Sequence, residues 1–380
     1  ELYDYLAYHF FYLNEGEFRH CTEKYGKEDF RETLSVYIAS ERPPFPFKEI
    51  SYADMVESFQ KLKKADYTKF ITPTDQLDRE VFEKYDDYKY NFAEHGLGLI
   101  NTPSVYNTCS DYFMNKLRLR CGSYSFKAPA QTWENGTAKE IWRSIGAIWR
   151  GINTSEELTP AVYMSAFRLG TYIATQFKPI VARSVYEMTG AKRVLDTSMG
   201  WGDRLCGAMA SETINHYVGI DPRTQNHPIY KNQVEFYQKH TSFFEKPTKV
   251  DLHESPAEDF DYSDYQDYFD LVFTSPPYFN VERYGDDDTQ SWIRYESINA
   301  WNEYFLHKTL EKIIPTLKKG GKMAISLGIS PKLSVKGKKS LNKAKIVDSD
   351  VDDDLVDSED DSLPKKVQPK NQTKQGKRGC

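Results

Sequence analysis

Short apolar runs alternate with amphipathic stretches in the part of the chain that follows Gly190. Each run has the length of a short buried strand, and the runs cover residues 194–196, 217–221, 249–252, 269–273 and 321–327. Segments of helical character separate them, including one at about 298–314. Strands that alternate with helices are typical of a doubly wound, mainly parallel sheet. The pattern therefore predicts an α/β domain over residues 151–330.

The chain before Gly190 has a different pattern, in which apolar residues recur at helical intervals. This spacing is seen in residues 52–62, 141–150 and 160–188, and Pro179 marks the start of a new helix within the last of these. We therefore predict an α-rich amino-terminal region over residues 1–150.

The last fifty residues have few apolar positions. An acidic block at 348–361 is followed by a basic block at 365–378. Neither block can bury enough apolar surface to fold. We predict a disordered tail over residues 331–380.

Composition narrows the possible partners. The chain has 380 residues, of which 39% are hydrophobic, and a net charge of −6, so a nucleic-acid partner would require a local basic surface. Its five cysteines are scattered, with no Cys-x-x-Cys pair, so neither a metal site nor a disulfide framework is expected. No apolar run approaches the ~18 residues of a membrane span. We expect a soluble, intracellular protein, cytoplasmic or nuclear.

One segment combines basic and aromatic residues in the way that a local nucleic-acid surface requires. Its basic residues are interleaved with aromatic ones, and the set comprises Tyr112, Phe113, Lys116, Arg118, Arg120, Tyr124, Phe126, Lys127 and Trp133. Such residues can contact phosphates and stack on bases. An ordinary amphipathic surface with its aromatic rings in a core has the same pattern. Both interpretations stay open.

Acidic residues and glycines follow the first three predicted strands. Asp196 ends the first strand and precedes Gly200 and Gly202, Asp221 ends the second, and Asp259 follows the third. Glycines allow a ligand to approach the backbone closely at the start of a helix, and an acid after the second strand can accept hydrogen bonds from ribose hydroxyls. Asp259 could bind an adenine amino group. Each acid alone is typical of a turn, but their joint placement indicates a cofactor site.

The fourth predicted strand is followed by Ser275-Pro276-Pro277-Tyr278. Two consecutive prolines fix φ twice and supply no N–H, so they hold a rigid turn whose carbonyls are unpaired. The Ser275 side chain, the Pro276 carbonyl and the Tyr278 ring would suit a planar group that bears an exocyclic amine. A proline-capped strand end with a buried tyrosine is the alternative for this segment alone.

Taken in order, five segments resemble the motifs of the S-adenosylmethionine-dependent amino-methyltransferases of DNA, the cytosine-N4/adenine-N6 family. They are Phe177-Lys178-Pro179 and residues 195–202, 219–222, 256–259 and 274–278. The resemblance covers about 175–330 and implies a class I methyltransferase domain with a Rossmann-like sheet. It implies that S-adenosyl-L-methionine is the cofactor, bound by Phe177, Asp196, Gly200, Gly202, Asp221 and Asp259, and that Ser275, Pro276, Pro277 and Tyr278 are catalytic.

The resemblance also implies a mechanism. A base of DNA would be flipped from the helix and stacked on Tyr278, with its amine held by Ser275 and the Pro276 carbonyl. Methyl transfer would be direct, and the Pro-Cys dipeptide of cytosine-carbon methyltransferases is absent. Serine at the first motif position favours cytosine over adenine. The loop at 282–292 either closes over the base or is a plain surface loop.

The order of the motifs also bears on target recognition. It resembles the subgroup whose recognition region lies outside the motifs, so residues 1–150 are, by position, the candidate for target recognition. The family sheet normally continues with two more strands after the fifth, and here a low-complexity segment follows Ser330. An RNA or protein-glutamine methyltransferase of the same fold, or a catalytically silent nucleic-acid-binding subunit, are the alternatives, and the oligomeric state is not predicted.

Overall fold

The computed structural model describes residues 1–73, 98–100, 103–123, 125–241, 247–279 and 281–326. The predicted disordered tail at 331–380 lies outside these residues, as does Tyr124. The described residues all belong to one compact unit. None of the helices in these ranges is long and apolar enough to cross a membrane.

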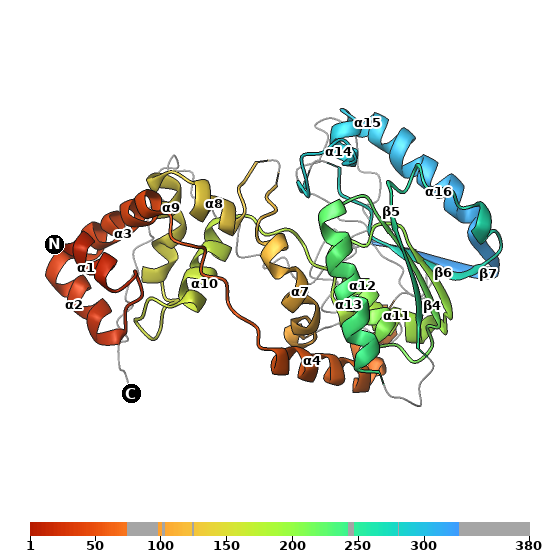
Figure 1. The fold of residues 1–380 in the computed structure, drawn as a ribbon, viewed down its shortest axis with the longest axis horizontal. Coiled ribbons are helices and arrows are strands. Elements are labelled where there is room, and N and C mark those ends of the chain that lie inside the picture. Colours follow the sequence, from red (N-terminus) through yellow and green to blue (C-terminus); the bar gives the residue numbers. More distant parts are fainter. Residues whose placement is uncertain (74–97, 101–102, 124, 242–246, 280, 327–380) are drawn as a thin grey trace, which may run out of the picture. The chain divides into compact units, whose positions relative to one another are not determined.

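The amino-terminal region is helical, as predicted (Figure 1). The α-helices that the structure describes in this region are α1 (Leu2–Tyr8), α2 (Glu15–Tyr25), α3 (Lys27–Glu41), α4 (Tyr52–Lys64), α7 (Thr108–Arg118), α8 (Pro129–Asn135) and α9 (Ala138–Ile145), and α10 (Pro160–Gly170) follows it. Capping residues in the sequence explain several of the starts. Asn14 and Glu17 form a reciprocal capping box at α2, and Thr137 and Glu140 form another at α9. A small antiparallel pair, β1 (Ile71–Pro73) and β2 (Gly98–Ile100), lies between α4 and α7 in sequence.

The predicted α/β sheet is confirmed. It consists of β3 (Arg193–Asp196), β4 (His216–Asp221), β5 (Lys249–Glu254), β6 (Phe269–Thr274) and β7 (Leu317–Ile325). The five strands are all parallel and are arranged in the order β5-β4-β3-β6-β7. Counted in chain order within the sheet this is 3-2-1-4-5, a doubly wound topology that reverses direction between β3 and β6. Ligands of such sheets bind at the carboxyl ends of the strands near this reversal.

Helices cover both faces of the sheet (Figure 1). They are α11 (Pro179–Thr189), α12 (Asp203–Met209), α13 (His227–Lys239), α14 (Ser291–Arg294), α15 (Ile298–Ala300), a π-helix (Trp301–His307) and α16 (Lys308–Ile313). Alternate strand residues enter two different cores. Val194 and Tyr217 pack with α11, α12 and α13, whereas Leu195 and Val218 pack with Ile313 of α16. This alternation is the expected result of strands buried on both faces.

The last strand differs from its prediction. β7 begins at Leu317, before the predicted start at residue 321. Its pairing with β6 shifts register between Phe269 and Leu271, and Gly320 has a φ of 77°. Glycine favours this left-handed conformation, so Gly320 forms an irregularity inside the strand and not a break before it.

Hydrophobic packing crosses the predicted domain boundary at residue 150 in both directions. Met55 and Phe59 of α4 and Met114 of α7 belong to the core of the sheet. Tyr163 and Phe167 of α10 instead pack with the helices that precede residue 150. The boundaries at 150 and 330 therefore stay predictions about domains, while the packing ties the amino-terminal helices to the sheet through α4 and α7.

Candidate active site

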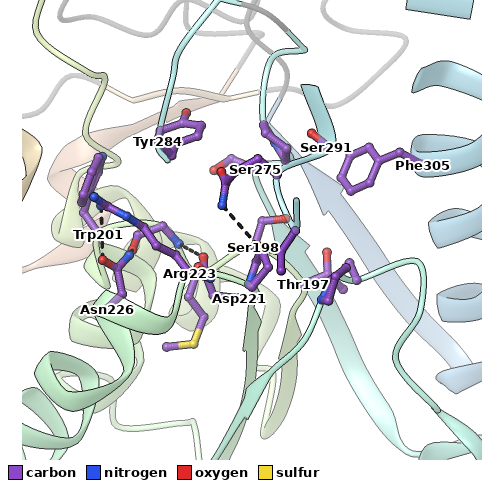
Figure 2. Close-up of a pocket in the computed structure, with 18 of the residues that line it drawn as sticks. Thr197, Ser198, Trp201, Asp221, Arg223, Asn226, Ser275, Tyr284, Ser291 and Phe305 are labelled. Carbon is purple, nitrogen blue, oxygen red and sulfur yellow. Dashed lines mark hydrogen bonds between the residues drawn. The ribbon is translucent and has the colours of Figure 1, made fainter. Parts of the chain in front are cut away.

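A pocket lies at the carboxyl ends of the strands (Figure 2). Five of the predicted site residues line it: Phe177, Gly200, Asp221, Ser275 and Pro277. The other five, which are Asp196, Gly202, Pro276, Tyr278 and Asp259, are not among its lining residues. The structure thus brings the predicted cofactor segment and the Ser-Pro-Pro segment to one cavity.

The turn after β3 has a conformation that requires glycine. Gly200 and Gly202 have φ values of 57° and 77°, which are left-handed. A Cβ at Gly202 would lie 2.2 Å from Oε1 of Gln233, so a side chain there would require the buried Gln233 side chain to move. The Gly200 carbonyl accepts hydrogen bonds from the Tyr230 hydroxyl at 2.5 Å and Asn226 Nδ2 at 2.9 Å. The turn is therefore fixed by the start of α13 before any ligand binds.

Asp221 lies at the end of β4, where it was predicted, and lines the pocket. Its two oxygens accept one backbone N–H each, from Gly200 at 2.8 Å and Arg223 at 3.0 Å. Burial raises the pKa of Asp221, while these hydrogen bonds oppose that shift. A carboxylate has further lone pairs, so Asp221 can still accept a hydroxyl of a ligand.

Asp196 does not face the pocket but holds Arg204, a residue that the sequence did not indicate. Arg204 contacts both oxygens of Asp196, with Nε at 2.9 Å from Oδ2 and Nη2 at 3.2 Å from Oδ1. Its Nη1 donates to Ser275 Oγ at 2.6 Å, and its Nη2 also donates to the Ser198 carbonyl. Burial alone would lower the pKa of Arg204, but Asp196 raises it, so the guanidinium stays charged. Arg204 thereby joins the turn after β3 to the Ser-Pro-Pro segment.

Trp201 is a second residue that the sequence argument missed, although it stands between Gly200 and Gly202. Its ring lies 5.3 Å from the Arg223 guanidinium and 5.9 Å from the Tyr284 ring, and all three side chains line the pocket (Figure 2). The Trp201 Nε1 donates to the Thr175 carbonyl at 3.1 Å. A fixed aromatic wall of this kind suits a flat ligand.

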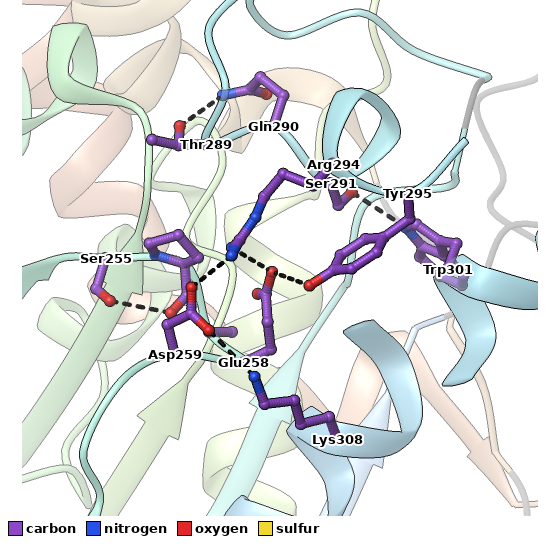
Figure 3. A network of polar contacts seen from close by, with 12 residues as sticks. Ser255, Glu258, Asp259, Thr289, Gln290, Ser291, Arg294, Tyr295, Trp301 and Lys308 are labelled. Carbon is purple, nitrogen blue, oxygen red and sulfur yellow. Dashed lines mark hydrogen bonds and ion pairs between the residues drawn. The ribbon is translucent and has the colours of Figure 1, made fainter. Parts of the chain in front are cut away.

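The acid that enters the pocket after β5 is Glu258, not the predicted Asp259 (Figure 3). Glu258 is buried, its Oε1 accepts from Arg294 Nη1 at 2.6 Å and from the Tyr295 hydroxyl at 3.0 Å, and its Oε2 has no hydrogen-bond partner among the described residues. Asp259 is more exposed and pairs with Arg294 at 2.7 Å and Lys308 at 3.2 Å. The open oxygen of Glu258 is thus the acceptor available at this strand end.

The loop after Tyr278 forms part of the pocket wall. Residues 289–292 line the pocket, which excludes a plain surface loop. The loop is anchored by Glu282, a buried carboxylate whose Oε1 accepts from the Tyr172 hydroxyl and the Thr175 N–H, each at 2.7 Å. Its Oε2 accepts from the Tyr284 hydroxyl. Burial, and to a lesser extent the nearby Glu282, raises the pKa of Tyr284, so this hydroxyl stays protonated and acts as a donor.

The basic and aromatic segment at 112–133 is mostly engaged in internal contacts. Arg120 pairs with Glu134 at 2.7 Å and Lys127 with Glu140 at 2.9 Å, and Trp133 is fully buried. Tyr112 and Phe126 remain exposed. Trp133 thus enters a core, whereas Tyr112 and Phe126 lie on the surface, so both interpretations of the segment stay open.

Two further observations bear on the identity of the site. Within the ranges that the structure describes, no group of three or more His, Cys, Asp or Glu side chains could hold a metal ion. No protein-family model matches the chain, and no curated protein matches it in sequence.

Proposed function

We propose that the chain is an S-adenosylmethionine-dependent amino-methyltransferase that acts on the exocyclic amine of a base in DNA. The observation that carries the proposal is the meeting of Gly200, Asp221 and Ser275 in one pocket at the reversal point of the sheet, although the three residues follow three different strands. A cofactor segment and a rigid Ser-Pro-Pro turn then share one cavity, as a two-substrate reaction requires.

The pocket residues fit the cofactor in the order in which the strands lie. Glu258 follows β5, Asp221 ends β4, and the glycine turn follows β3. Neighbouring strands are about 4.8 Å apart, so these groups form a row about 10 Å long. The open oxygen of Glu258 suits an amine of adenine, Asp221 suits the ribose hydroxyls, and the turn leaves room for the amino-acid part. When bound, the cofactor supplies an activated methyl group on a sulfonium.

Ser275 is the residue proposed to receive the target amine. Its hydroxyl accepts one hydrogen bond from Arg204, which leaves a second lone pair for an amine N–H. Because Asp196 neutralises Arg204, the guanidinium can fix Ser275 without placing a net positive charge beside the amine. The Pro276 carbonyl is the expected second acceptor and the Tyr278 ring the expected stacking surface. Such alignment of two reactants can lower a barrier by about 7 kcal/mol or more.

The experiment that tests the proposal offers the purified chain four acceptors. They are duplex DNA, single-stranded DNA, RNA and a glutamine-containing peptide, each with labelled S-adenosylmethionine, and mass spectrometry identifies the methylated product. We expect label in DNA, on the cytosine amine in preference to adenine. Ser275→Ala should abolish transfer while cofactor binding persists. Ser255→Ala, directly after the edge strand β5 but outside the pocket lining, should leave transfer unchanged.

Each other outcome favours a stated alternative. Label in RNA or in the peptide favours a methyltransferase with a different acceptor. Cofactor binding with no label in any acceptor favours a catalytically silent subunit. Failure to bind the cofactor rejects the proposal altogether.

A further inference from the structure

Asp203, the first residue of α12, lines the pocket and has an oxygen without a partner. Its side chain is 2% exposed. The Oδ1 atom accepts from Ser110 Oγ at 2.5 Å and from Gln176 Nε2 at 3.1 Å. The Oδ2 atom is buried and has no hydrogen-bond partner among the described residues. A buried acceptor without a hydrogen bond costs free energy, so a ligand that supplies a donor here gains affinity.

A second carboxyl behind Asp203 leaves this cluster short of positive charge. Gln176 Nε2 also donates to Asp111 Oδ1 at 2.9 Å, so one amide bridges the two acids. Arg118 is the cation of the cluster, and its Nη2 lies 3.5 Å from Asp111. Asp203 itself is bonded to a neutral hydroxyl and a neutral amide. Among the residues that the structure describes, one guanidinium thus faces two carboxyls, so the fully ionised cluster carries a net negative charge at the pocket wall.

The other acids around the pocket are better compensated. Asp196 has Arg204 as an ion-pair partner, and Glu258 has Arg294. Both oxygens of Asp221 accept backbone N–H groups. Among the described acids that line the pocket, Asp203 alone combines an open oxygen with no cation in hydrogen-bond contact. The missing group is therefore a donor that also carries positive charge.

We propose that Asp203, supported by Asp111, is the subsite for the α-ammonium group of the cofactor's amino-acid part. The inference rests on the proposed function, because it concerns the same ligand. An ammonium has three N–H donors and a full charge, whereas a sulfonium has no N–H to offer. Asp203 follows β3, on the opposite side of Asp221 from Glu258, so this assignment places the nucleoside over β5 and β4 and the amino acid over β3. Asp203 is thus a specificity residue for amine-bearing ligands.

The subsite gives binding a pH dependence. Burial first, together with Asp111, raises the pKa of Asp203 to about 7, while Arg118 opposes the shift. Tyr237 of α13 and Cys206 of α12 also lie near Asp203, and burial raises the pKa of both, so they remain neutral in this range. Below about pH 7 the free carboxyl holds a proton that an incoming ammonium must displace. Affinity for amine-bearing ligands should rise with pH up to about 7 and then level off.

The test compares two ligands by calorimetry on the full chain. One is S-adenosylhomocysteine, and the other is its analogue with hydrogen in place of the α-amino group, which keeps the adenosine and the carboxylate. We expect the wild type to bind S-adenosylhomocysteine about 10-fold or more tightly than the analogue, because a hydrogen bond to a charged group contributes this much to affinity. Asp203→Asn should bind both ligands alike, whereas Asp221→Asn should weaken both and keep their ratio.

The outcomes separate the two proposals. If S-adenosylhomocysteine binds but Asp203→Asn keeps the wild-type ratio, the subsite is overturned and the proposed function stands. If neither ligand binds the wild type, the proposed function fails first. If Asp203→Asn does not fold, the pH dependence of the wild type tests the subsite. Its preference for S-adenosylhomocysteine over the analogue must increase from about pH 5.5 to about pH 8, and a constant preference rejects the subsite.

Discussion

Removal of the Arg204 guanidinium should destabilise the protein more than most single substitutions. In Arg204→Met the fully buried Asp196 carboxylate keeps, within the described part of the chain, only the Tyr217 hydroxyl at 2.7 Å and the Ser198 N–H at 3.2 Å. Breaking a buried ion pair by removing one partner costs about 3–5 kcal/mol. Against a total stability of about 5–15 kcal/mol, this is a large fraction.

Urea unfolding monitored by tryptophan fluorescence measures the loss of free energy. The double variant Asp196→Asn with Arg204→Met should recover part of it, because an amide has no charge to strand and can still accept from Tyr217. Arg204→Lys should fall between the wild type and Arg204→Met, since lysine keeps the charge but cannot contact Asp196 and Ser275 with one planar fork.

Two results would refute the reasoning. A loss below about 1 kcal/mol in Arg204→Met would mean that the buried pair contributes no more than a surface pair. A double variant as unstable as Arg204→Met would mean that the cost arises from lost packing and not from the stranded charge. The proposed methyl transfer gives a separate readout, because Arg204→Lys should lose that activity through Ser275 even where it remains folded.

Three further predictions concern residues around the pocket. Glu258→Gln should weaken binding of the proposed cofactor by about 1–3 kcal/mol, because its amide presents a donor where an acceptor is needed. Asp259→Asn breaks half-exposed ion pairs and should change binding and stability by less than about 1 kcal/mol. Calorimetry measures the change in binding and urea unfolding measures the change in stability. Gly202→Ala should cost more stability than Gly190→Ala, because both glycines have left-handed φ but a Cβ clashes only at residue 202, and equal losses in urea would contradict this. Since burial raises the folded-state pKa of Asp203 from 3.8 to about 7, the wild type should lose stability as pH rises from about 4 to about 7, and Asp203→Asn should lack that loss when unfolding is measured across this window.

The fold was largely predictable because its signals are local. All five strands of the sheet were located from short apolar runs, and the doubly wound arrangement followed from their alternation with helices. The start of β7 was placed wrongly because Gly320 and Gly321 look like a break in the sequence. Whether a glycine ends a strand or bends it depends on the neighbouring strand, which is far away in the chain.

The candidate site was predictable only in its backbone. Gly200, Asp221 and Ser275 were expected at strand ends and line the pocket, since strand ends are set by local sequence. The side-chain partners could not be predicted, because they come from distant elements. Arg204 meets Ser275 across 71 residues and Ser110 meets Asp203 across 93. No local motif predicts that Asp196 forms an ion pair with an arginine.

The choice between Glu258 and Asp259 shows the same limit at the scale of one residue. Adjacent side chains point in different directions, and the sequence Pro-Ala-Glu-Asp offers two acids. Arg294 contacts both, and Lys308 contacts Asp259 from α16 (Figure 3). Only the packing of these later elements turns Glu258 inward and leaves Asp259 toward solvent. The position directly after a strand therefore locates the acidic pair but does not identify which carboxylate enters the pocket.

The balance of charge along the row of strand ends gives the pocket a direction. At the β5 end Glu258 is neutralised by Arg294, and at the β6 end Ser275 lies against the neutral pair of Arg204 and Asp196. Between them, at the β3 turn, Asp203 is the acid without a contacting cation. A ligand with a neutral amine at one end and a cationic amine at the other can satisfy both open carboxyl oxygens in one orientation only, because reversal would place a charged ammonium beside Arg294. For the proposed cofactor, the orientation that remains keeps the nucleoside away from Ser275 and places the amino-acid end beside it, as the proposed transfer to an amine held by Ser275 requires.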